Sequence, residues 1–419
     1  MNMRVSGQHP VASSSTDTRL KTLTPLTEWS AAQLTEMRSR LGLDGIQLPP
    51  VRTGIALYRV TYATPDIRGN ATTASGLLMV PLEKKEPAPV LSYQHGTTAG
   101  RDAGPSRNLK ASQHLMVAAV YGAAGYLWVL ADYIGFGDSA EPNPEQYKDP
   151  SLVNVHGANH RRIMHPYCNA KTEASACADL LIAAGEAAEQ LGVKLSGKLF
   201  LSGYSQGGQA SMALHRHLET DSELKRRFKV TASAPIAGPH DIVRTVERLL
   251  ERPNPIFGTA TFAYGMMARD HVGKFWPKVT DFLVSPYAER AWTNFSEPPP
   301  GRDEYPWKDG FSGVDPKSIL TPKVYADLFV DGRMRPDTEY AKACVASSAH
   351  LGWKSDTPIL LISPREDDIC PVDINGVDTE RTMKANGFTQ VGLLLVPGDH
   401  LTGARAAFAG AVACMEKLR

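Results

Sequence analysis

The sequence lacks the features that mark membrane and nucleic-acid-binding proteins. Its longest apolar stretch, near Leu393–Val396, has the length of a strand, far short of the ~20 residues that span a bilayer. The 45 basic and 44 acidic residues nearly cancel, so there is neither a basic field nor an acidic tail. We therefore expect no transmembrane segment and no nucleic-acid partner.

Cysteine is also scarce. The chain of 419 residues holds five cysteines, too few for a disulfide scaffold, and an odd number leaves at least one thiol unpaired. Cys168 and Cys177 are spaced to close a small loop, and two reduced thiols are the equal alternative. The other three are Cys344, Cys370 and Cys414.

The N-terminus has no apolar segment of the kind found in a signal peptide. Residues 1–20 are polar and rich in Ser and Thr, which predicts a flexible tail and no signal peptide on this chain. Two localisations follow as alternatives: the cytoplasm, or export by a signal removed from this chain.

The hydrophobic pattern predicts an α/β fold. Helix-spaced apolar positions cover 26–42, and segments 54–63 and 74–81 alternate as an antiparallel hairpin. Buried strands are then expected at 89–93, 126–131, 199–201, 229–236, 358–362 and 391–396, and helices at 113–124, 175–191, 206–218, 372–386 and 404–417. Such alternation implies right-handed crossovers and a mostly parallel sheet covered on both faces.

One segment, 239–356, interrupts this rhythm. It carries helical patterns at 241–251 and 259–269, a proline-dense stretch at 296–306 and no buried strand. It is too long for a connecting loop, so we expect a mainly helical cap on a core made of residues 21–238 and 357–419.

A candidate nucleophile lies between a predicted strand and a predicted helix. Residues Gly203–Gly207 read G-x-S-x-G, a turn whose glycines allow a strand to reverse sharply into a helix. Such a turn holds the serine Oγ above the sheet at a helix N-terminus. We therefore predict Ser205 as the nucleophile.

A serine needs a base and an orienting acid, which follow it in this order of strands. His400 follows the last strand and is the only histidine after residue 350. Three carboxylates follow the preceding strand. Matching Cys370-Pro371 to the end of a G-x-x-D-x-x-V-P pattern favours Asp367, with Asp368 as the rival, while Glu366 and Asp399 are interpreted as turn residues.

Two backbone N–H groups are expected to form an oxyanion hole. One belongs to Gln206, directly after the serine, and the other to Thr97, in the loop that follows strand 89–93. His95 is interpreted as a loop-stabilising residue, not a base. Candidate substrate-binding residues are Tyr204, His95, Thr98, Phe262 and Met266. The apolar residues of the insertion either line an acyl pocket or form the core of the cap itself.

The sequence gives little sign of a metal or cofactor. His156, His160 and His165 cluster, but without an H-E-x-x-H pattern or acidic ligands. Gly135 and Gly137 form no dinucleotide-binding fingerprint. We expect no metal and no cofactor.

These motifs together resemble those of the α/β-hydrolase superfamily, and more narrowly the secretory lipase family and its bacterial relatives. The resemblance is carried by residues 91–97, 131–139 and 203–208 and by the late aspartate and histidine. It implies hydrolysis of a small-molecule or lipid ester through an acyl-enzyme, a helical lid between nucleophile and acid, and a secreted or periplasmic location. Amide hydrolysis on the same triad and a non-catalytic binding role are the alternatives.

Overall fold

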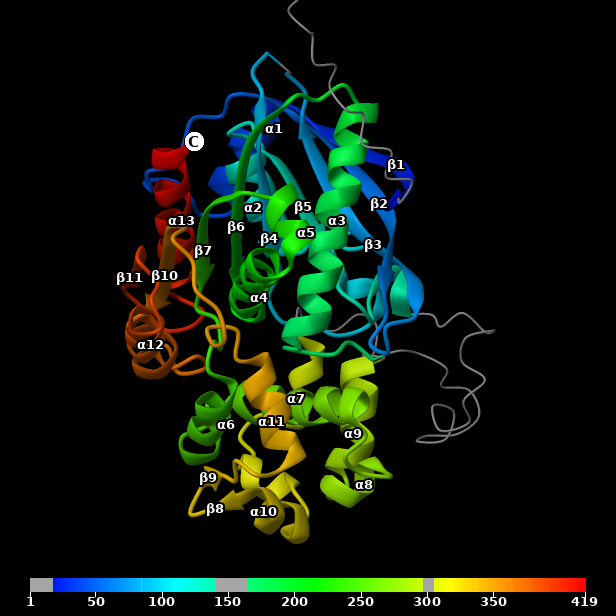
Figure 1. Ribbon diagram of the computed structural model, residues 1–419, viewed down its shortest axis with the longest axis vertical. Coiled ribbons are helices and arrows are strands. Elements are labelled where there is room, and N and C mark those ends of the chain that lie inside the picture. Colours follow the sequence, from blue (N-terminus) through cyan, green and yellow to red (C-terminus); the bar gives the residue numbers. More distant parts are fainter. Residues whose placement is uncertain (1–17, 84, 141–163, 297–304) are drawn as a thin grey trace, which may run out of the picture.

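A nine-stranded mixed sheet forms the centre of the molecule (Figure 1). The structure is a computed structural model and describes residues 18–83, 85–140, 164–296 and 305–419. The strand order is β1-β2-β3-β5-β4-β6-β7-β10-β11. Neighbours are antiparallel from β1 to β5 and parallel from β5 to β11. This is the α/β-hydrolase fold, as the sequence predicts.

The strands and the helices that cover them follow the predicted alternation. The strands are β1 (Leu20–Trp29), β2 (Ile55–Pro65), β3 (Ala71–Pro81), β4 (Ala88–Gln94), β5 (Leu127–Ala131), β6 (Leu195–Tyr204), β7 (Val230–Ile236), β10 (Ile359–Pro364) and β11 (Val391–Val396). The helices of this part are α1 (Ala31–Arg40), α2 (Ser112–Val117), α3 (Ala170–Gln190), α4 (Gln206–Thr220), α5 (Ser222–Arg227), α12 (Thr379–Ala385) and α13 (Ala404–Leu418).

The helix expected over 26–42 is wrong in its first turn. Residues up to Trp29 belong to β1, which pairs with β2, and the helix begins at Ala31. Ser30 separates the two elements: its side chain accepts the N–H of Gln33, while the Gln33 side chain accepts the N–H of Ser30. This capping box fixes the start of α1. Of the predicted tail, residues 1–17 lie outside the described part.

Apolar clusters on both faces hold the helices against the sheet. On one face α3 and α4 bury Leu180, Ala184 and Leu214 against the strands. On the other face α13 packs on β7 and β10, and the segment around Tyr121 packs on Trp128. The sheet is therefore covered on both sides, as parallel strands require.

The helical layer, residues 242–347, lies at the end of the sheet where the parallel strands terminate (Figure 1). Its apolar core, which includes Tyr264, Met266 and Phe295, is continuous with Tyr167 and Ile369 of the part that surrounds the sheet. Its elements are α6 (Ile242–Glu251), α7 (Gly258–Gly273), α8 (Val279–Phe282), α9 (Tyr287–Ser296), α10 (Pro322–Leu328), the short hairpin β8 (Phe329–Val330) and β9 (Arg333–Met334), and α11 (Glu339–Ser347).

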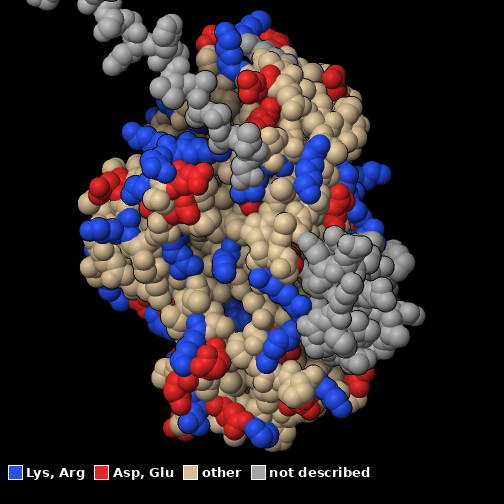
Figure 2. All heavy atoms as spheres, turned by 45° about the vertical axis from the view of Figure 1, so that its right-hand side comes forward, with Lys and Arg blue, Asp and Glu red and all other residues tan. Residues whose placement is uncertain are grey.

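Charges of both signs lie on the surface (Figure 2), and the two cysteines of the candidate pair are not joined. Figure 2 shows basic and acidic side chains interspersed on one face of the molecule. Among the described helices, none combines the length and the apolar composition that a membrane span requires. Cys168 and Cys177 are free thiols, so the disulfide alternative for this pair is wrong.

Candidate active site

Ser205 occupies a strained turn between β6 and α4. Its φ of 58° and ψ of −121° lie in a region that non-glycine residues rarely adopt. The glycines around it leave no room for a side chain. A Cβ on Gly203 would lie 2.3 Å from the carbonyl oxygen of Gly207, and a Cβ on Gly207 would lie 1.9 Å from the carbonyl oxygen of Gln94. The turn therefore requires glycine at both positions.

Ser205, His400 and Asp367 form a chain of hydrogen bonds. The Nε2 atom of His400 lies 2.9 Å from Ser205 Oγ. The Nδ1 atom lies 2.9 and 3.0 Å from the two carboxylate oxygens of Asp367. With the Nδ1 proton donated to the carboxylate, Nε2 is left to accept the proton of the serine. The structure thus brings together the three residues predicted for the triad.

The surroundings of His400 favour its charged form. Burial lowers the pKa of His400, but the charge of Asp367 and its hydrogen bond, with the charges of Asp368 and Asp399, raise it above the ordinary value overall. Asp367 is buried and also accepts the N–H groups of Ile369 and Cys370 at 3.0 and 2.7 Å. Its carboxylate is therefore fixed from two sides.

The other carboxylates near this loop have structural partners. Asp368 accepts the amide of Asn254 at 2.6 Å, and Glu366 accepts the N–H of Gly398 at 2.8 Å. Asp399 accepts the N–H groups of Leu401 and Thr402 at 2.9 and 2.8 Å. None of these three carboxylates has a described hydrogen bond to the His400 ring, so the geometry favours Asp367 over Asp368.

The two predicted oxyanion donors lie on loops that are held in place. Gln206 is the first residue of α4, so its N–H has no acceptor within the helix. The loop that carries Thr97 is fixed by Gly96, whose N–H donates to the side chain of Gln113 at 2.8 Å. The Thr97 hydroxyl lies 3.0 Å from the hydroxyl of Tyr167, so a structural partner occupies it.

The side chain of Gln206 belongs to a buried polar cluster. The side-chain nitrogen of Gln206 donates to Glu173 Oε1 at 2.7 Å and to Nε2 of His165 at 2.6 Å. The other His165 nitrogen lies 2.8 Å from the carbonyl oxygen of Ile134, which makes the ring neutral. Burial lowers the pKa of His165 to about 4 and raises the pKa of Glu173 to about 8. The cluster fixes the residue that follows Ser205.

Two cavities meet at Ser205. The larger, of ≈ 140 Å³, is bounded by His95, Thr97, His400 and Trp307 among others. The smaller, of ≈ 50 Å³, is enclosed mainly by α6, α7 and the loop before Asp373. Ser205 borders both of them, and His400 borders only the larger.

Most of the predicted substrate-binding residues border these cavities. Tyr204, His95 and Thr98 line the larger one, and Phe262 lines the smaller. Met266 lines neither, because the cavity face of α7 is formed at intervals of four by Thr261, Gly265 and Arg269, and Met266 packs in the core of the helical layer. His95 is buried and stacked on Tyr133, as expected of a residue that stabilises its loop.

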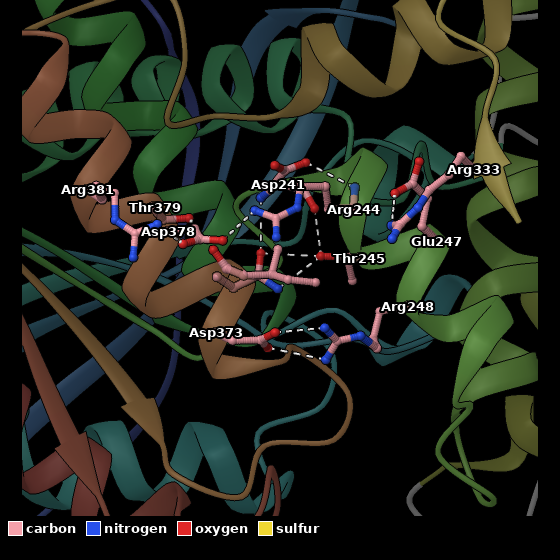
Figure 3. A network of polar contacts seen from close by, with 12 residues as sticks. Asp241, Arg244, Thr245, Glu247, Arg248, Arg333, Asp373, Asp378, Thr379 and Arg381 are labelled. Carbon is pink, nitrogen blue, oxygen red and sulfur yellow. Dashed lines mark hydrogen bonds and ion pairs between the residues drawn. The ribbon is translucent and has the colours of Figure 1, made fainter.

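Helix α6 lines the smaller cavity with one side. Its other side carries a polar network, which Figure 3 shows. Ile242, Val246 and Leu249 line the cavity. On the opposite side Arg244 pairs with Asp378 and Arg248 with Asp373, both at 2.7 Å. These contacts join α6 to the turn that precedes α12.

Two members of the histidine cluster in the sequence, His156 and His160, lie outside the described residues. Atoms of Asp367, Cys370 and His400 lie within 4.8 Å of one another. However, both His400 ring nitrogens are used, one toward Asp367 and one toward Ser205.

The sequence reasoning missed two charged residues near the site, Glu173 and Arg269. Both are buried, Glu173 in α3 and Arg269 in α7. Each has another charged residue close by in the sequence, Lys171 and Asp270 respectively, so no local pattern sets either of them apart.

The solved structures most similar to this chain include esterases and lipases. The rice cell wall degrading esterase LipA from Xanthomonas oryzae has a TM-score of 0.77 and 24% identity, over 96% of this chain and 100% of LipA. Candida antarctica lipase A in its closed state has a TM-score of 0.65 and 13% identity, over 96% of this chain and 81% of the lipase. No family model and no curated protein matches the sequence. At these identities the similarity shows the fold.

Proposed function

We propose that the protein is a serine hydrolase of carboxylic esters, with Ser205, His400 and Asp367 as its catalytic triad. The observation that carries the proposal is the unbroken hydrogen-bond chain through these residues, with 2.9 Å on each side of the imidazole. The esterase and lipase activities of the structural neighbours support the same reaction class. We also propose that residues 239–356 act as a cap on a core formed by 21–238 and 357–419.

In the proposed reaction Ser205 Oγ attacks the ester carbonyl while its proton moves to Nε2 of His400. The N–H groups of Gln206 and Thr97 stabilise the resulting oxyanion. The imidazolium then gives that proton to the alcohol oxygen as the C–O bond breaks, leaving an acyl-serine. Water attacks the acyl group, His400 takes its proton and returns it to Ser205, and the carboxylic acid leaves.

Replacement of the serine tests the proposal. Ser205→Ala is expected to abolish hydrolysis of 4-nitrophenyl butyrate with an unchanged circular dichroism spectrum, because the nucleophile is lost. The matched control is Ser211→Ala, in helix α4 that follows the turn, which is expected to retain activity. A fluorophosphonate should label the wild type and not Ser205→Ala. Retained turnover in Ser205→Ala contradicts the proposal, and an unlabelled, inactive wild type favours a binding role.

A further inference from the structure

The wall of the smaller cavity contains a buried guanidinium that the proposed reaction does not use. Arg269, on α7, is only 5% exposed and borders this cavity together with Ser205. Its Nη1 donates to the carbonyl oxygen of Gly265 at 3.0 Å. Its Nε is buried and has no hydrogen-bond partner among the described residues. Arg269 thus borders the cavity next to Ser205 with one buried N–H donor unused.

No negative charge in the described part of the chain forms an ion pair with this guanidinium. Its neighbours Tyr340 and Cys344 are neutral, because burial raises the pKa of each. The carboxyl group of Glu173 lies close enough to interact with it electrostatically, but burial raises the pKa of Glu173 to about 8. A buried charge without a partner costs free energy. An anion bound beside Arg269 would therefore be stabilised by it.

The position of His400 indicates which part of an ester occupies the smaller cavity. The imidazole must give its proton to the leaving alcohol oxygen, so the alcohol lies on the His400 side of Ser205. His400 borders the larger cavity and not the smaller. The acyl part therefore enters the smaller cavity, toward Arg269.

We propose that the enzyme prefers esters whose short acyl group ends in a carboxylate, such as monoesters of small dicarboxylic acids, and that Arg269 binds this carboxylate. The inference rests on the proposed ester hydrolysis. Ile242, Val246 and Phe262 supply apolar walls for the methylene groups. A guanidinium is planar and binds a carboxylate through two parallel hydrogen bonds, and the small volume selects short chains.

Two esters that differ only in charge test the inference. Monoethyl glutarate carries the carboxylate, and ethyl 4-carbamoylbutanoate replaces it by an amide of the same shape. We expect the wild type to hydrolyse the anionic ester with a kcat/KM about 10–100-fold higher, mainly through KM. Arg269→Gln should bring this ratio to about one, whereas Arg269→Lys should retain part of it.

Arg40→Gln, at an exposed position of α1, is the matched control and should keep the wild-type ratio. Equal or faster hydrolysis of the amide ester by the wild type overturns the inference, as does an unchanged ratio in Arg269→Gln. If Arg269→Gln fails to fold, the kcat/KM ratio of the two esters on the wild type still tests the inference.

A second measurement separates this inference from the proposed function. If the wild type hydrolyses neither ester, titration calorimetry of Ser205→Ala with glutarate and with butyrate tests the site alone. Tighter binding of glutarate, lost in the double variant with Arg269→Gln, supports the anion site without any turnover. Equal binding, or none, overturns it.

Discussion

Asp367 sets the charge state of His400. Because this carboxylate raises the pKa of His400, kcat/KM should fall as the pH drops through a value above about 6.5, where the imidazole becomes protonated and stops accepting the serine proton. Asp367→Asn should lower kcat about 10³–10⁴-fold and move this acid limb to lower pH, since burial is then opposed only by the charges of Asp368 and Asp399. The measurement is kcat/KM between about pH 5 and pH 9.

Asp368→Asn is the control for this prediction, since Asp368 hydrogen-bonds Asn254. It should keep kcat within a few-fold of the wild type, with only a small shift of the acid limb. A severe loss in Asp368→Asn with an active Asp367→Asn would reverse the assignment of the acid.

The glycines of the serine turn are a second feature at the scale of single residues. Gly207→Ala should destabilise the protein by about 3 kcal/mol or more, because the new Cβ would meet the backbone of Gln94 at 1.9 Å. Gly185→Ala, in the middle of α3 with nothing within 4 Å of the new Cβ, should instead stabilise it by about 0.5–1 kcal/mol. Urea unfolding of both variants measures the difference, and equal midpoints would contradict it.

At the scale of elements, α6 forms a wall of the smaller cavity and is hydrogen-bonded to the segment that precedes α12. Asn375 is buried, accepts the N–H of Asp241 at 3.0 Å and donates to Thr245 at 2.9 Å. Asn375→Ala should therefore lower the free energy of unfolding by about 1–3 kcal/mol. It should also raise KM, because α6 carries Ile242 and its neighbours into the smaller cavity.

The matched control is Arg248→Gln, which breaks a partly exposed ion pair with Asp373. It should change stability by less than about 1 kcal/mol and leave KM nearly unchanged. Thermal unfolding and ester kinetics check both variants. A larger loss in Arg248→Gln would mean that charge, and not the buried amide, holds α6.

At the scale of the whole molecule, buried neutral histidines make folding depend on pH. Burial lowers the pKa of His95, His215 and His240 to about 3 and of His165 to about 4. Their unfolded forms bind protons below about pH 6.5 and the folded forms do not, so stability should fall as the pH drops from about 6.5 toward 4. Urea midpoints at several pH values measure this slope.

Glu173 contributes in the opposite direction. Its pKa of about 8 in the folded state exceeds the ordinary value, so its contribution weakens folding as the pH rises from about 4.3 to 8. Glu173→Gln should remove this component and steepen the loss of stability on the acid side. An unchanged profile in Glu173→Gln would show that the carboxyl group is not neutral in the folded protein.

Local pattern was enough to predict the succession of most strands and helices along the chain and three residues that the structure joins by hydrogen bonds. Ser205, Asp367 and His400 each follow a strand in a motif that sequence spacing displays. Pattern was not enough for β1, because its pairing with β2 overrides a helical spacing. Nor was it enough for Arg269 and Glu173, whose importance depends on which helices pack around the cavity. Met266 illustrates the same limit, since its side of α7 is decided by packing.

The two ends of the helical layer meet. His350 Nδ1 lies 2.9 Å from the carbonyl oxygen of His240, and the N–H of Ile242 donates to Ser348 Oγ at 3.1 Å. The chain thus leaves the sheet after β7 and returns to it before the neighbouring strand β10 at two points that lie side by side. The entropic cost of closing a loop rises only slowly with its length. The sheet therefore imposes no fixed length on the segment between these two points. A shorter or longer helical layer is therefore compatible with the same strand order and the same serine turn.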